Sequence, residues 1–157
     1  MSKILTIITN PDRRLRQKSI KILKTEIKDK KFQEFLNSLA KTMKKFDGIG
    51  LASPQVGVNI RLIVINTKNG VLIMVNPKIL RKSILKEWGE EGCLSVPDTF
   101  GKVKRSKNLL CTFLDNKGDL KKISTQGLLA RVIQHEIDHL DGILFIDKAK
   151  EIVTNVK

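Results

Sequence analysis

Two histidines and a glutamate near the C-terminal end of the chain have the residue types and spacing of a metal site. They lie in residues 134–139, Gln-His-Glu-Ile-Asp-His, a His-Glu-x-x-His pattern. In a helix, residues four apart lie on one face about 6 Å apart, so His135 and His139 can bind one metal ion. Glu136, beside them, would have a carboxylate free to transfer protons. The pattern therefore predicts a metal centre with an adjacent acid–base group.

The segment that carries this pattern is predicted to be a buried helix. Its apolar residues form two stripes, Leu129, Ile133, Ile137 and Leu140 on one side and Leu128 and Val132 on the side of the histidines. A helix that is apolar on two sides is normally buried. Gly127 and Gly142 bracket it, and Gly142 is well placed as a C-terminal cap. Two ordinary structural histidines are the alternative, but these are the chain's two histidines and they fall at ligand spacing.

A third protein ligand is needed, because a catalytic zinc-type site uses three protein ligands and a water molecule. The candidates are Cys93, Cys111 and the acidic residues. Cys93 follows a glycine in a polar turn, where a thiolate would be accessible. Cys111 lies in the apolar run 109–113, which is typical of a buried cysteine. The sequence therefore favours Cys93.

The remaining elements indicate an α+β fold, with mixed or antiparallel sheets packed around the central buried helix. Apolar residues from Asp29 to Phe46 have the spacing of one helical face. Strands are expected at residues 4–8, 61–66, 71–76, 79–85, 103–105, 109–114 and 120–125. Asn69-Gly70 is a hairpin signal, and residues 115–118 form a second turn. Strands and helices do not alternate regularly, which argues against a parallel doubly wound sheet.

Residues 47–57 contain three glycines and a proline, which disfavour a regular element and allow close approach of the backbone. The spacing matches neither a dinucleotide-binding nor a P-loop pattern. A plain linker would be less apolar. We expect a loop packed against the site that presents backbone groups and Gln55.

Composition indicates one globular domain, residues 1–157, with 41% hydrophobic and 29% charged residues. No signal or transit peptide and no run of ~20 apolar residues is evident, so a cytoplasmic location without membrane contact is expected. Two cysteines do not suggest a disulfide scaffold. The net charge of +14 is interpreted mainly as a solvated basic surface, with weak attraction to RNA or the ribosome as a secondary consequence. Specific DNA binding is not expected, and one Trp without aromatic–basic interleaving disfavours a single-strand binding platform.

Three stretches together resemble peptide deformylase. The family has a Gly-φ-Gly-φ-Ala-Ala-Pro-Gln loop, a Glu-Gly-Cys-Leu-Ser turn and a Gln-His-Glu-x-x-His-Leu helix, in that order. This chain has Gly-Ile-Gly-Leu-Ala-Ser-Pro-Gln at 48–55, Glu-Gly-Cys-Leu-Ser at 91–95 and Gln-His-Glu-Ile-Asp-His-Leu at 134–140. The resemblance runs from Pro11 to about Asp147, and three ordered motifs make it specific.

The resemblance implies hydrolytic removal of the N-formyl group from the initiator methionine of nascent chains, with N-formylmethionyl peptides as partners. It implies Cys93, His135 and His139 as ligands of one divalent metal ion, with Fe²⁺ expected and Zn²⁺, Ni²⁺ or Co²⁺ able to replace it. The ion would lower the pKa of its bound water and so supply hydroxide to attack the formyl carbon. Glu136 would accept the water's proton and later pass it to the leaving amine.

The resemblance also implies how the oxyanion and the substrate are bound. The Gln55 amide and the Leu94 backbone N–H would stabilise the tetrahedral oxyanion. Backbone around Ile49 and Gly50 would pair with the peptide as an added strand. The implied substrate-binding set also includes Glu91 and Gly92. Spacing places Leu128 and Val132 on the His135 face, where they would line a methionine pocket or belong to the ordinary core.

The chain departs from the family at several positions. Ser53 replaces a usual alanine, and Phe100 stands where many bacterial members have a substrate-contacting arginine, so recognition beyond methionine is expected to be weaker or different. Arg105 matches a common basic residue and is expected to pair with Glu91 as structural support. Little follows Asp147, so ribosome docking through the long C-terminal helix of many members is not implied.

Two other classes of protein share part of these features. A zinc metallopeptidase also has the two-histidine helix, but it usually takes its third ligand downstream, where only a short tail follows His139. An RNA- or ribosome-binding module with a structural zinc would close its site with four protein ligands, and Cys111 would be the fourth.

Overall fold

The computed structural model describes residues 2–155. Its helices and strands follow the chain in the order α1 (Lys30–Lys45), β1 (Gly50–Ala52), β2 (Leu62–Thr67), β3 (Gly70–Lys82), β4 (Lys86–Cys93), β5 (Val96–Ser106), β6 (Asn108–Leu114), β7 (Leu120–Gln126), α2 (Gly127–Leu140) and β8 (Lys150–Thr154). Four short 3₁₀ turns occur in these residues, two before α1 at Arg13–Arg16 and Lys24–Lys28, one after β1 at Ser53–Val56 and one after α2 at Phe145–Asp147. The predicted α1 and α2 and the hairpin at Asn69-Gly70 are confirmed.

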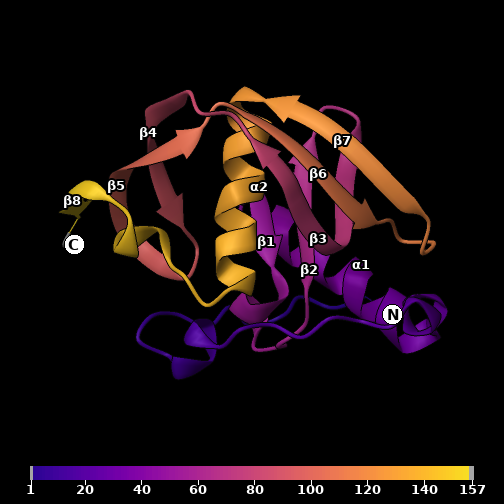
Figure 1. Ribbon diagram of the computed structural model, residues 1–157. Coiled ribbons are helices and arrows are strands. Elements are labelled where there is room, and N and C mark those ends of the chain that lie inside the picture. Colours follow the sequence, from indigo (N-terminus) through magenta and orange to yellow (C-terminus); the bar gives the residue numbers. More distant parts are fainter. Residues whose placement is uncertain (1, 156–157) are drawn as a thin grey trace.

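Two antiparallel sheets flank the central helix. The larger sheet has the strand order β1-β2-β3-β6-β7, and the smaller has the order β4-β5-β8. Helix α2 stands between them (Figure 1). The α+β architecture with antiparallel sheets around the buried helix is therefore confirmed. The predicted metal ligands come from two of these elements: Cys93 is the last residue of β4, and His135 and His139 lie on α2.

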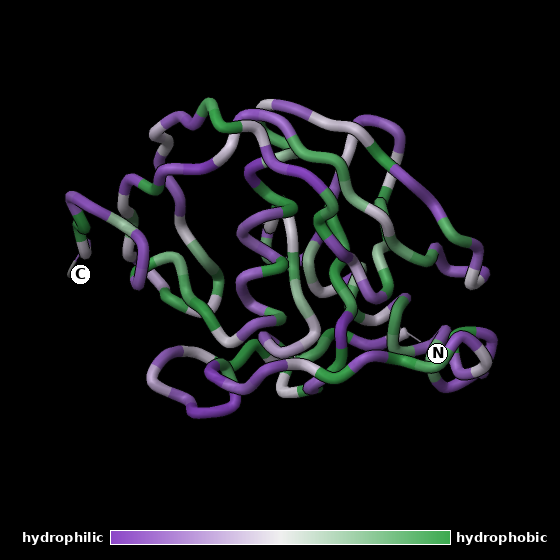
Figure 2. The backbone as a smooth tube through the Cα atoms, viewed as in Figure 1, coloured by the Kyte–Doolittle hydropathy of each residue, from purple (hydrophilic) through white to green (hydrophobic). Residues whose placement is uncertain are grey.

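Strand β2 shows why both helices form around the larger sheet. Successive side chains of a strand point to opposite faces. Ile63 and Ile65 belong to the core cluster that contains the α2 residues Ile133, Ile137 and Leu140. Leu62 and Val64 belong to a second cluster, together with Leu39 and Met43 of α1. The sheet is thus covered by α2 on one face and by α1 on the other, and the strands nearest α2 carry many hydrophobic residues in Figure 2.

Several elements differ from the sequence-based expectation. Residues 4–8 do not form a strand, although Ile8 N donates to Gln55 O at 2.8 Å. The segment 79–85 is largely a continuation of β3 past Pro77, and residues 47–57 contain β1 and a 3₁₀ turn. Cys93 therefore ends a strand that the sequence did not predict, instead of lying in a free turn.

Strands β4 and β8 were missed because neither has an apolar periodicity. On β4, the outward Lys86, Trp88 and Glu90 alternate with inward residues that, before Cys93, are themselves charged or glycine. All five residues of β8 are exposed. No helix within residues 2–155 is both long and apolar enough to cross a lipid bilayer.

Candidate metal centre and active-site cavity

Cys93, His135 and His139 converge where the smaller sheet meets α2. Their ligand atoms lie within 4.8 Å of one another. The Nε2 atom of His139 is 3.2 Å from Cys93 Sγ and 3.2 Å from His135 Nε2. Within the described part of the chain, these are the three His, Cys, Asp or Glu side chains whose ligand atoms lie close enough to hold one metal ion together. A thiolate and two imidazoles form a donor set used by catalytic zinc-type sites.

The contacts of the two imidazoles suit a bound cation. Nδ1 of His135 lies 2.9 Å from Glu91 Oε2, which leaves Nε2 facing the other ligand atoms. Burial opposes protonation of His135, but Cys93, Glu91 and Glu136 outweigh it and raise the pKa of this imidazole to about 10, so a metal ion would take the place of the proton on Nε2. Burial, followed by the charge of the neighbouring His135, lowers the pKa of His139. Neutral His139 can donate a lone pair, and its Nδ1 has no hydrogen-bond partner in residues 2–155. The three side chains therefore fit a divalent metal ion.

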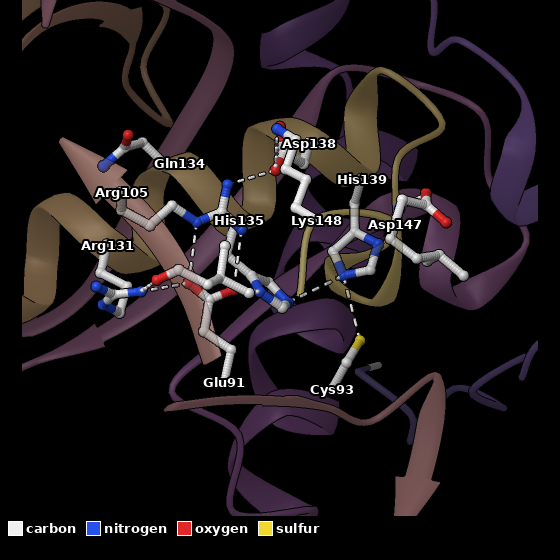
Figure 3. Close-up of polar contacts among 12 residues, drawn as sticks. Glu91, Cys93, Arg105, Arg131, Gln134, His135, Asp138, His139, Asp147 and Lys148 are labelled. Carbon is white, nitrogen blue, oxygen red and sulfur yellow. Dashed lines mark hydrogen bonds and ion pairs between the residues drawn. The ribbon is translucent and has the colours of Figure 1, made fainter. Parts of the chain in front are cut away.

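A buried ionic network holds Glu91 in place (Figure 3). Arg105 donates from Nε to Oε1 and from Nη2 to Oε2 of Glu91, both at 2.9 Å, and it also pairs with Asp138. Arg131 Nη1 donates to Oε1 at 2.8 Å. Burial opposes the charge of Glu91, but Arg105 and His135 outweigh it and lower the pKa of this carboxyl group. Glu91 therefore stays ionised beneath the histidine, and the expected Arg105–Glu91 pairing is confirmed.

Glu136 is buried next to His135 in α2. Its Oε2 atom finds no hydrogen-bond partner within the described residues, and burial raises its pKa to about 7. Gly50 of β1 packs directly on this carboxylate, because a Cβ atom built at residue 50 would lie 2.5 Å from Glu136 Oε1. A glycine at position 50 is therefore required for the loop to lie this close to Glu136.

Gln55 brings an amide to the same place. Its Oε1 accepts a hydrogen bond from Ala52 N at 2.8 Å, which fixes which end of the amide carries the donor. Its Nε2 lies 3.4 Å from Cys93 Sγ and 3.2 Å from Ser95 Oγ. The glycine-containing loop thus packs against the site and presents Gln55, as its composition indicates.

A cavity of about 550 Å³ opens onto these groups. The residues of the predicted site that line it are Ile49, Gly50, Gln55, Glu91, Gly92, Cys93, Leu94, Leu128, Val132, His135 and Glu136. His139 is 1% exposed and lies behind the cavity wall. Val132 is buried, whereas Leu128 is 63% exposed. Phe100 also lines the cavity.

The structure separates the two cysteines. Cys111 is buried in β6 among core residues, and burial raises the pKa of its thiol to about 11. It lies outside the cluster of ligands, so it does not close the site as a fourth ligand. Three polar residues near the site were missed from the sequence: Ser95, Arg131 and Asp138. Arg131 had a usable signal, because it lies four residues before His135 on the same helical face.

Comparisons with known proteins agree with this geometry. A profile of the family described as polypeptide deformylase matches residues 4–155. A peptide deformylase of Dictyoglomus thermophilum is 42% identical over 144 residues, which cover 88% of this chain and 94% of the relative. The crystal structure of peptide deformylase from Thermotoga maritima has a TM-score of 0.89 at 35% identity and covers 94% of this chain and 98% of its own.

A third similar structure is the Met-Ala-Ser bound class I type b peptide deformylase from Acinetobacter baumannii. It has a TM-score of 0.89 at 32% identity and covers 94% of this chain and 99% of its own. The family profile spans nearly the whole chain, and these relatives are similar in both sequence and fold. The chain therefore belongs to the polypeptide deformylase family and is a metal-dependent hydrolase.

Proposed function

We propose that this chain removes the formyl group from the N-terminal methionine of nascent polypeptides, with water as co-substrate and formate and a free amine as products. The observation that carries the proposal is the arrangement of five groups from three parts of the chain. Cys93, His135 and His139 converge, and Glu136 and the Gln55 amide lie beside them at the inner end of the cavity. This is a donor set for a metal ion, an acid–base group and a hydrogen-bond donor in one place.

Cys93, His135 and His139 would hold the metal ion. When bound, a divalent ion lowers the pKa of a coordinated water molecule towards neutrality and so makes a nucleophile available. Ferrous iron is proposed as the native metal, with zinc, nickel or cobalt as replacements. The thiolate donor suits both iron and zinc, and metal analysis of the anaerobically purified protein distinguishes the two.

Glu136 is proposed to carry the proton. Its carboxylate is buried beside His135 and one of its oxygens has no hydrogen-bond partner in residues 2–155, so it can accept a proton from the attacking water. The same group would then pass that proton to the amine as the C–N bond of the formamide breaks. Such a positioned acid–base group contributes typically about 10²–10⁴-fold to a rate.

The negative charge that develops on the formyl oxygen requires donors that are already in position. Gln55 is proposed as one, because Ala52 N holds its Oε1 and leaves Nε2 to donate. The backbone N–H of Leu94 is proposed as the second, since Leu94 follows Cys93 and lines the cavity. Preorganised donors of this kind stabilise a transition state more than a ground state.

The substrate is proposed to bind as an added strand along β1. This strand is at the edge of the larger sheet. Ile49 O accepts from Asn66 N of β2 at 2.8 Å, and antiparallel strands alternate the direction of their main-chain groups. The N–H and C=O of Gly50 should therefore point to the open side. Gly50 would contact the peptide backbone, whereas Ile49, 51% exposed, would contribute its side chain.

The methionine side chain is proposed to enter the part of the cavity lined by Val132, Leu128 and Gly92, next to Glu91. The side chain of Glu91 is already bonded to two arginines and His135, so Glu91 could meet substrate mainly through its backbone. The similar Acinetobacter baumannii structure is described as Met-Ala-Ser bound, a peptide that begins with methionine. Phe100, 41% exposed at the cavity, would replace polar recognition beyond methionine with an apolar contact.

Weak association with the ribosome, and hence a cytoplasmic location, is proposed from the net charge of +14. The outer face of the smaller sheet supports it. Lys104 Nζ lies 5.8 Å and Lys150 Nζ 5.4 Å from the ring centre of Trp88, which is 46% exposed. This aromatic–basic grouping is assembled from three strands and is not visible in the linear sequence. Trp88 is the chain's one Trp, so its fluorescence would report ribosomal RNA binding directly.

The test is a formate-release assay on anaerobically purified protein, together with metal analysis of the same sample. We expect formate and a free N-terminus from a formyl-Met peptide, and no cleavage of internal peptide bonds. Absence of formate release from a metal-loaded sample would refute the proposal. Cleavage of internal bonds would support a metallopeptidase instead.

A further inference from the structure

Arg131 connects the helix that carries the histidines to the sheet that carries Cys93. It lies one helical turn before His135, and its side chain is 11% exposed. Besides its ion pair with Glu91 at 2.8 Å, Nη1 donates to Val103 O of β5 at 2.9 Å. Nη2 donates to Glu87 O of β4 at 3.0 Å. One guanidinium therefore bonds both β4 and β5 of the smaller sheet, and Figure 3 shows it beside Glu91.

The space for this guanidinium exists because residue 89 is glycine. Along β4, alternate residues face α2, and these are Glu87, Gly89, Glu91 and Cys93. A Cβ atom at position 89 would lie 2.7 Å from both Cζ and Nη2 of Arg131. The missing side chain lets the guanidinium lie directly against the strand, two residues before Glu91 and four before Cys93.

We propose that Arg131, seated over Gly89, is a positioning residue that fixes Sγ of Cys93 relative to the two imidazoles. The inference rests on the proposed metal site. The three ligands come from two separate elements, so their geometry depends on how β4 is held against α2. Hydrogen bonds from a charged donor are about twice as strong as neutral ones, and the planar guanidinium allows several at once. Arg131 also holds the carboxylate that orients His135.

The test measures release of zinc from the loaded protein into an excess of chelator. We expect Arg131→Met to release zinc at least about tenfold faster than the wild type. The loss of a contact behind a metal ligand usually lowers metal affinity by about 10–100-fold, and faster release would account for this loss. Arg131→Lys should rescue part of the loss, because its single ammonium can replace one contact but not all of them.

Arg61→Met is the matched control. Arg61 is 13% exposed and bonds the other end of α2, at Leu140 O and at Asp141 Oδ1. Its loss should lower the unfolding temperature by a similar amount and leave zinc release unchanged. A general weakening of the helix would instead accelerate release in both arginine variants, and that result would overturn the inference.

Gly89→Ala tests the same contact from the strand. The added methyl group meets the flexible end of Arg131, so it should displace the guanidinium without unfolding the protein. We expect faster zinc release, and no further acceleration when Gly89→Ala and Arg131→Met are combined, because both remove one contact. Independent, multiplying effects would overturn the inference, as would wild-type release from Arg131→Met. A wild-type chain that bound no metal at all would refute the proposed function instead.

Discussion

Glu91 Oε2 and His135 Nδ1 lie 2.9 Å apart, although the two residues are 44 positions apart in the chain. This contact holds the imidazole so that its Nε2 faces Nε2 of His139, 3.2 Å away. The carboxylate is in turn bonded by Arg105 and Arg131, so the orientation of His135 depends on three buried groups from two strands and one helix. Such outer contacts tune the basicity and direction of a ligand.

Replacing Glu91 should weaken both metal binding and folding. In Glu91→Ala, metal affinity should fall by about 10–100-fold. Two buried arginines would lose one of their partners, and breaking a buried ion pair typically costs about 3–5 kcal/mol; the remaining contacts of Arg105 with Asp138 and of Arg131 with two carbonyls place the expected cost at or below this range. Glu91→Gln keeps an acceptor for His135 and should lose less affinity. Metal titration measures the loss of affinity, and denaturant unfolding of the metal-free protein measures the loss of stability. If Glu91→Ala bound metal as tightly as the wild type, Glu91 would not orient His135 for metal binding.

Glu136→Ala should leave the metal in place and remove most of the activity. Glu136 is not among the converging ligand atoms, so metal content should match the wild type. The rate should fall by at least about 10²-fold, because a positioned acid–base group is lost. Formate release at saturating substrate, with metal analysis of the same sample, tests this. An active variant would show that Glu136 does not carry the proton.

The two cysteines should respond differently to the same substitution. Cys93→Ser replaces a thiolate ligand by a poorer one, so the metal should be lost at moderate chelator concentration. Cys111→Ser places a hydroxyl in the core of β6 and should lower stability while the metal content stays unchanged. Metal analysis after dialysis distinguishes them, and equal metal loss in both variants would be inconsistent with the three-ligand site.

Loss of the Gln55 amide should affect kcat more than KM. A single oxyanion donor is worth about 10²–10³ in kcat, or about 2.7–4 kcal/mol. We expect a loss of this size for Gln55→Leu, measured by steady-state formate release. Ser95→Ala is the control, because it removes the hydroxyl that Gln55 contacts at 3.2 Å but keeps the amide. An equal loss in both variants would mean that the hydroxyl, not the amide, is needed.

The linear sequence determined the parts of this protein that depend on local periodicity and residue chemistry. The spacing of His135, Glu136 and His139 required one helical face, and the apolar stripes around them required that this helix be buried. The preference for Cys93 over Cys111 followed from the polar and apolar surroundings of each residue. These signals were enough for the central helix, the hairpin at Asn69-Gly70 and the candidate ligands.

The tertiary structure decided what depends on contacts between distant segments. Strand β4 was missed because its inward residues are polar or glycine and interact with α2 through Glu91 and Arg131, so apolar alternation is absent. The grouping of Trp88 with two lysines arises from cross-strand pairing. Spacing along the chain cannot express such contacts, since strand pairing and helix packing bring residues together regardless of their separation in sequence. The sequence thus identified which side chains could bind and react, and the packing of β4 against α2 set how they are held.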